Sequence, residues 1–190
     1  MSLSDFERAL VFILSAEGGY ANNKNDRGGE TYKGIARNSN PHWSGWGKID
    51  AAKATGILSH QELTIIFDAD KELQTEIADL YKSNYWTPIR GDSVPWPVNC
   101  VIFDCAVNSG PHATVKILQH ALTIKEDGAF GPVTLAEVGK WTPSNLAGKI
   151  IAARKQFYED LVAKDNTQSE FLIGWMKRLD HLSKFISEAA

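Results

Sequence analysis

The stretch "SDFERALVFILSAEGG" (residues 4–19) carries the clearest folding signal in the chain. Ser4 and Glu7 have the spacing of a capping box, in which each side chain bonds the backbone N–H of the other residue at a helix start. The apolar residues then follow the 3, 4, 7 spacing of one buried helix face: Phe6, Ala9, Leu10, Ile13 and Leu14. Gly18 and Gly19 end the pattern, so we predict an amphipathic helix that stops at the glycine pair.

Helix signals dominate the rest of the chain as well. A second capping box, Ser59 with Glu62, opens a predicted helix that runs to the "NYW" ahead of Thr87 and Pro88. Further helices are predicted over 98–108, over 112–122, from Pro132, from Ser144 and, at the end of the chain, over a stretch that carries apolar residues from Phe171 to Ile186. No alternating strand pattern exceeds a few residues, so the predicted class is all-α. The prolines and glycine of "RGDSVPWPVN" (90–99) predict a short hinge that divides the chain into regions 1–93 and 94–190.

Composition narrows the function. The 190 residues have a formal net charge of −3 and no run of Lys and Arg, which argues against nucleic acid as a partner. "LVFILSA" (10–16) is too short to span a membrane and lacks the basic flank of a signal peptide, so we expect synthesis in the cytoplasm. The five His show no metal-ligand spacing, and we expect neither a metal nor another cofactor.

Glu17 occupies a position that an apolar residue would be expected to fill. Phe6, Leu10, Ile13 and Glu17 are 4, 3 and 4 residues apart, so Glu17 continues the buried face of the helix. Partial removal from water and the negative end of the helix dipole both disfavour its ionised form, as a general acid requires. The alternative is that the last turn frays and Glu17 points into solvent.

Asp26 follows nine residues later, in a loop rich in Asn, Asp and Gly. One buried and one solvated carboxyl group are the minimum apparatus for cleaving a glycosidic bond. An Asp in such a loop can also serve only as a turn former, and the residues alone leave both roles open.

These residues carry a resemblance. "EGGYANNKNDRGGETYKGIA" (17–36) closely resembles the signature of glycoside hydrolase family 108, bacterial and prophage N-acetylmuramidases also described as secretion-activator proteins. The resemblance implies a lysozyme-like helical bundle of two lobes in one compact unit, with Glu17 as the catalytic residue. A looser likeness to phage-type lysozymes implies roles for Asp26 and Thr31, although Thr31 comes one residue earlier than in that pattern.

Two stretches of the second half are similar to known motifs. "CVIFDCAVNSG" (100–110) places Asp104 and Asn108 four residues apart on one helix face, where they either bond internally or line a cleft. Its resemblance to a family motif implies that they approach the site. "LQHALTIKEDGAFGPVT" (118–134) resembles the core of peptidoglycan-binding modules, so 1–93 is predicted as the catalytic region and 94–190 as a peptidoglycan-binding-like region.

The prediction is therefore a muramidase that hydrolyses the β-1,4 bond between N-acetylmuramic acid and N-acetylglucosamine in peptidoglycan. Glu17 would protonate the leaving oxygen, and Asp26, with Thr31, would orient water or support the sugar cation. The predicted glycan contacts are Tyr20, Asn22, Tyr85, Trp86, Asp104 and Asn108.

Two alternatives stay open: a lytic transglycosylase, and a non-catalytic wall-binding accessory of a secretion system. The expected partner is the glycan strand of peptidoglycan, with no stable membrane insertion. Action in the periplasm or cell wall would require export, through a holin pore or beside a toxin secretion system.

Overall fold

The structure is a computed structural model that describes residues 3–22, 29–56 and 59–188. The chain forms two compact units. The small unit comprises Leu10–Ser83, and the large unit combines the residues before Leu10 with those from Asn84 onward. Each unit is described separately below.

Helix α1 (Asp5–Ala16) begins and ends where the sequence predicts. The Ser4 backbone N–H donates to Glu7 Oε2 at 2.8 Å, and the Glu7 N–H donates to Ser4 Oγ at 3.3 Å, which completes the capping box. The helix stops one residue before Glu17, ahead of the glycine pair. The side chain of Glu17 is half-buried at this end.

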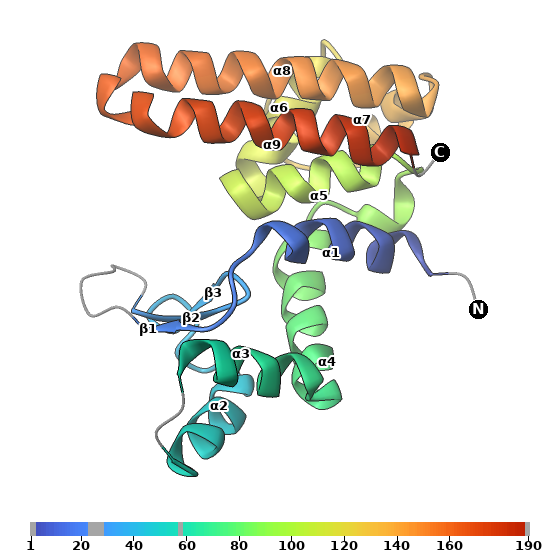
Figure 1. Cartoon of the computed structure of the whole chain (residues 1–190). Coiled ribbons are helices and arrows are strands. Elements are labelled where there is room, and N and C mark those ends of the chain that lie inside the picture. The colour runs from blue at the N-terminus through green and yellow to red at the C-terminus, as the bar shows by residue number, and fades with distance from the viewer. Residues whose placement is uncertain (1–2, 23–28, 57–58, 189–190) are drawn as a thin grey trace. The chain divides into compact units, whose positions relative to one another are not determined.

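A short antiparallel sheet follows in the small unit (Figure 1). Strand β1 (Ala21–Asn22) pairs with β2 (Glu30–Tyr32), which pairs with β3 (Ile35–Ala36). Lys33 and Gly34 link β2 to β3 with φ of 48° and 74°. Positive φ at both central residues is the mark of a type I′ hairpin turn, the type that matches the twist of its strands.

The helical part of the small unit differs from the prediction in two places. Helix α2 (Gly45–Ala54) is not among the predicted helices. The predicted single helix from Ser59 is two helices, α3 (His60–Ala69) and α4 (Lys71–Tyr81). Asp70 separates them because its backbone is extended, with ψ of 99°, and its carboxylate accepts the N–H groups of Glu72 and Leu73, both at 3.0 Å. Asp70 is thus the N-cap of a new helix.

The large unit is built mainly from five helices that lie at the predicted places: α5 (Val98–Ser109), α6 (Pro111–Ala121), α7 (Pro132–Val138), α8 (Pro143–Lys164) and α9 (Ser169–Glu188). Short turns lie between them or ahead of them: the π-helical turn Lys82–Trp86, which begins in the small unit, and the 3₁₀ turns Gly91–Ser93 and Asn166–Gln168. Residues 98–106 are buried all round, so α5 is the central helix, and α6 and α8 pack against it. The long helices α8 and α9 lie side by side (Figure 1). The predicted all-α class is confirmed, and the residues that the structure describes add one very short sheet.

Within the described residues, no helix is both long enough and apolar enough to cross a membrane.

Candidate active site

The carboxyl of Glu17 lies against the turn between β2 and β3. A Cβ placed on Gly34 would stand 2.7 Å from Glu17 Oε2 and 2.7 Å from the Tyr81 hydroxyl. Both distances are shorter than real Cβ contacts, so only a glycine lets the carboxyl and the phenol approach this turn together. Three separate elements thus meet here: the end of α1, the β2–β3 turn and the end of α4.

The turn itself is held by side chains of α3 and α4. The Tyr81 hydroxyl donates to the Lys33 carbonyl at 2.9 Å, and Lys33 Nζ pairs with Asp68 Oδ1 at 3.1 Å. A left-handed backbone costs a residue such as Lys33 roughly 1–2 kcal/mol, and these bonds offset that cost. The Glu17 carboxyl therefore faces a fixed surface.

A buried carboxylate anchors the strand that precedes the turn. Glu30 accepts hydrogen bonds from the Tyr20 hydroxyl and from Lys53 Nζ, both at 2.6 Å, and it forms an ion pair with Arg37 Nε at 2.8 Å. Burial, with the Glu30 bond, raises the pKa of Tyr20, so this phenol keeps its proton as a donor. Arg37 also binds Asp50, and its hydrogen bonds lower the pKa of that carboxyl. Because three side chains from different segments contact the buried charge, the network holds β2 in one position.

Of the three predicted catalytic residues, Glu17 and Thr31 lie in the described part of the chain. Thr31 is the middle residue of β2 and is half-buried, whereas Glu30 and Tyr32 on either side are buried. Successive strand residues point to opposite faces, so Thr31 is on the face opposite to the Glu30 network. Asp26 lies outside the described residues, and its role remains a prediction.

Two of the predicted sugar-stacking aromatics belong to the hydrophobic core, which corrects their assignment. Tyr20 is 5% exposed and packs edge-on against His60 and Phe67, with ring centroids 5.2 and 5.5 Å away. Trp86 is fully buried, and its indole N–H donates to Asp92 at 2.8 Å. Neither ring offers a face to a sugar in this structure, because neighbouring side chains cover it.

Asp104 bonds inside the protein and does not line a cleft, the other role that the sequence leaves open. Its carboxylate is 0% exposed and pairs with Arg154 NH1 and Arg178 Nε, both at 2.8 Å. Arg154 is likewise 0% exposed and also donates to the Tyr158 hydroxyl at 3.0 Å. Asp104 thus ties α5 to α8 and α9. It has no surface left for a glycan, which corrects its assignment as a contact.

The other predicted contacts keep some exposed surface. Asn22 is exposed on β1, and Tyr85 is half-buried in the π-helical turn. Asn108 is exposed near the end of α5, where its Nδ2 donates to the Asp104 carbonyl at 2.7 Å. All three stay predictions.

The "DGAFG" stretch is a turn built around a buried amide. Gln119 Nε2 donates to Asp127 Oδ1 at 2.7 Å and to Thr134 Oγ1 at 3.2 Å, while its Oε1 accepts from the Gly128 N–H at 2.8 Å. Hydrogen bonds from Ala129 and Gln119 lower the pKa of Asp127. These residues fix the path from α6 to α7.

Sequence reasoning missed Gly34, Tyr81 and Glu30. Gly34 lies within the recognised signature, but a glycine in a loop gives no sign of what it approaches. Tyr81 has the spacing of a core residue of α4, which its ring is. No group of three His, Cys, Asp or Glu that might hold a metal occurs among the residues that the structure describes.

Comparison with known proteins assigns both halves of the chain. Residues 10–110 match the model of the Glycosyl hydrolase 108 family, and residues 113–180 match a Predicted Peptidoglycan domain. Among solved structures, SagA of Brucella abortus is similar at 29% sequence identity and a TM-score of 0.66, over 94% of this chain and 91% of that protein. None of the curated proteins matches significantly.

Proposed function

Because the chain belongs to the glycosyl hydrolase 108 family and is a glycoside hydrolase, we propose that it is a muramidase with Glu17 as its general acid. The bond that it would hydrolyse is the β-1,4 linkage between N-acetylmuramic acid and N-acetylglucosamine. The match of residues 113–180 to a peptidoglycan domain supports peptidoglycan as the substrate. Peptidoglycan lies outside the cytoplasmic membrane, so the proposed place of action is the periplasm or cell wall.

The observation that carries the proposal is the position of the Glu17 carboxyl. A general acid must stand at a fixed place beside the leaving oxygen, and general acid–base groups contribute about 10²–10⁴-fold to rate. Glu17 is half-buried, and its Oε2 lies where Gly34 leaves room and where the Tyr81 hydroxyl also reaches. A carboxyl so confined has few orientations, which favours proton delivery to one point.

In the proposed reaction, Glu17 gives its proton to the glycosidic oxygen as the bond to the anomeric carbon breaks. Water then adds to that carbon: one of its protons stays on the new anomeric hydroxyl group, and the other passes to a carboxylate base, for which Asp26 is proposed. Asp26 and Thr31 are proposed to orient this water or to support the positive charge of the sugar. Exposed Asn22 is a proposed glycan contact of the same unit.

Replacing Glu17 by Gln tests the proposal, because the amide keeps the shape of the side chain but cannot supply the proton. We expect lysis of purified peptidoglycan, followed by turbidity and by new reducing ends, to fall by at least about a hundredfold. Glu170→Gln, at an exposed position of α9, is the matched control and should lyse at the wild-type rate. Thermal unfolding would show that both variants are folded.

The products separate hydrolysis from the alternatives. Muramic acid reducing ends are expected from hydrolysis, whereas anhydro-muramic ends would identify a lytic transglycosylase. Lysis that persists unchanged in Glu17→Gln would contradict the proposed acid. No lysis by the wild type, together with retained wall binding, would favour the accessory protein.

A further inference from the structure

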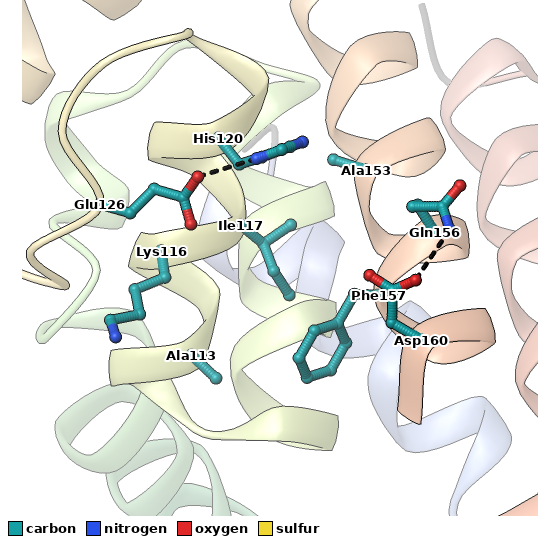
Figure 2. Close-up of a pocket in the computed structure, with 9 residues that line it drawn as sticks. All are labelled: Ala113, Lys116, Ile117, His120, Glu126, Ala153, Gln156, Phe157 and Asp160. Carbon is teal, nitrogen blue, oxygen red and sulfur yellow. Dashed lines mark hydrogen bonds and ion pairs between the residues drawn. The ribbon is translucent and has the colours of Figure 1, made fainter. Parts of the chain in front are cut away.

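Helices α6 and α8 of the large unit enclose a pocket that the proposed hydrolysis does not use. Its volume is about 240 Å³. Figure 2 shows the side chains that line it, with α6 and the loop after it on one side and α8 on the other. We propose that this pocket binds the peptide stem of peptidoglycan through a residue that carries both an ammonium and a carboxylate group on an aliphatic chain. This inference rests on the proposed function, which supplies peptidoglycan as the ligand.

The floor of the pocket is apolar. Ala113 and Ile117 come from α6, and Ala153 and Phe157 come from α8. Ile117 is almost fully buried, and it lies with Phe157 between the polar groups of the two sides (Figure 2). Such a floor accepts methylene and methyl groups, whose transfer out of water is favourable.

The rim carries charges of both signs. Lys116 lies on the α6 side and Asp160 on the α8 side (Figure 2). Both side chains are exposed, and neither forms an ion pair with another group in the part of the chain that the structure describes. Asp160 accepts one hydrogen bond, from Gln156 Nε2 at 2.9 Å. A ligand with a carboxylate and an ammonium group would pair with both side chains at once.

The other two ionisable groups of the rim bond one another. His120 Nδ1 lies 2.8 Å from Glu126 Oε1, so each of these side chains already has one partner. Lys116 and Asp160 are the rim groups that pair with no ionisable side chain among the described residues, and we take them as the cation and the anion offered to a ligand. The stem peptides of peptidoglycan match this pair, because they carry free carboxylates together with the side-chain amine of a diamino acid.

The size of the pocket favours the peptide over the sugar. The pocket volume is about 240 Å³. Sites for drug-sized molecules, a class that includes a disaccharide by its size, have volumes of roughly 300–1,000 Å³. Phe157 is the one Phe, Tyr or Trp among the nine lining residues, and it is half-buried. One amino-acid residue with its backbone fits this volume and this lining.

The test is a titration of the full-length wild-type protein with a soluble stem tripeptide that ends in a diamino acid, followed by heteronuclear NMR and calorimetry. We expect saturable binding with shifts at the backbone amides of Ala113, Ile117 and Ala153. Lys116→Glu and Asp160→Lys should each weaken it about tenfold, since each reversal replaces an attraction by a repulsion.

Two exposed charges of α8 outside the pocket provide matched controls. Lys155→Glu and Glu159→Lys make the same charge changes and should leave the dissociation constant within about twofold of wild type. Thermal unfolding of all four variants confirms that they fold. An equal loss of tripeptide affinity in the controls would show that the effect comes from the net charge of the protein, and it would overturn the site.

The result does not depend on hydrolysis, because the tripeptide contains no glycosidic bond. Absence of saturable tripeptide binding would overturn the pocket as a stem site while leaving the muramidase proposal intact. Peptide-free glycan strands that shift the same amides would overturn it as well, since the pocket would then be a sugar site. Conversely, absence of lysis by the wild type would remove the muramidase proposal, and undiminished lysis by Glu17→Gln would remove Glu17 as its acid, and neither result would affect tripeptide binding.

Discussion

Gly34→Ala tests whether the β2–β3 turn positions the Glu17 carboxyl. The new methyl group would stand 2.7 Å from Glu17 Oε2, whereas ordinary contact begins at 3.4 Å. The carboxyl must therefore retreat by about 0.7 Å (3.4 − 2.7), and a misplacement of about 1 Å can cost about a hundredfold in rate. We expect kcat/KM to fall by about thirtyfold to a hundredfold. The left-handed φ of 74° adds a loss of roughly 1–2 kcal/mol in the free energy of unfolding.

The assay separates these two effects. Initial rates of reducing-end release are measured on soluble glycan strands without stem peptides, and stability is measured by urea unfolding. Gly128→Ala is the matched control, because Gly128 has φ of 73° and its methyl group would meet the exposed ring of His112 instead of a carboxyl. The control should lose similar stability but keep kcat/KM within about twofold.

Two results would refute the reasoning. Wild-type kcat/KM in Gly34→Ala would mean that the carboxyl need not stand beside this turn during the reaction. An equal loss of kcat/KM in Gly128→Ala would mean that backbone strain, and not displacement of Glu17, reduces activity.

Three further predictions concern stability and reactivity. Asp104→Ala leaves the buried guanidinium of Arg154 without its carboxylate and should lower the free energy of unfolding by about 3–5 kcal/mol in urea titrations; a loss below about 1 kcal/mol would contradict the buried pair. Arg37 lowers the pKa of Asp50 in the folded state. The Arg37–Asp50 interaction therefore stabilises the fold at neutral pH, and this stabilisation is lost as the pH falls below about 4. Asp50→Asn should therefore be less stable than wild type at pH 7, and the difference should shrink near pH 3; a constant difference would exclude this linkage. Burial raises the pKa of both cysteine thiols, so neither should react with a disulfide reagent in the native protein and both should react in urea, whereas rapid native labelling would show that they are accessible.

The small unit shows which helix boundaries can be predicted from local sequence and which cannot. The two capping boxes could be predicted from the sequence, because their partners are three residues apart and meet in any chain that starts a helix there. The break at Asp70 had a local signal too, an Asp followed by Glu72, but the apolar spacing continued across it and suggested one helix. The structure breaks the helix because the Asp70 carboxylate caps the second one.

The aromatic residues show where sequence reasoning fails. Tyr20 and Trp86 are of the residue types that stack on sugar rings, but the same types also fill hydrophobic cores. Which role they take depends on what covers their rings, namely His60 and Phe67 for Tyr20 and the Phe6 and Phe103 rings for Trp86. Phe103 is 97 residues from Phe6 in the numbering of the chain, and no local pattern encodes such contacts.

By itself, the sequence determined the helical class, the starts of the main helices and the place of Glu17 directly after the first of them. These features depend on hydrogen bonds and spacings within a few residues. Only the tertiary structure decided what surrounds that carboxyl, because Gly34 and Tyr81 reach it from other elements, and that Asp104 is locked to Arg154 inside the large unit. Long-range packing determines the surroundings of a side chain, and those surroundings determine whether a carboxylate acts on a ligand or holds the fold together.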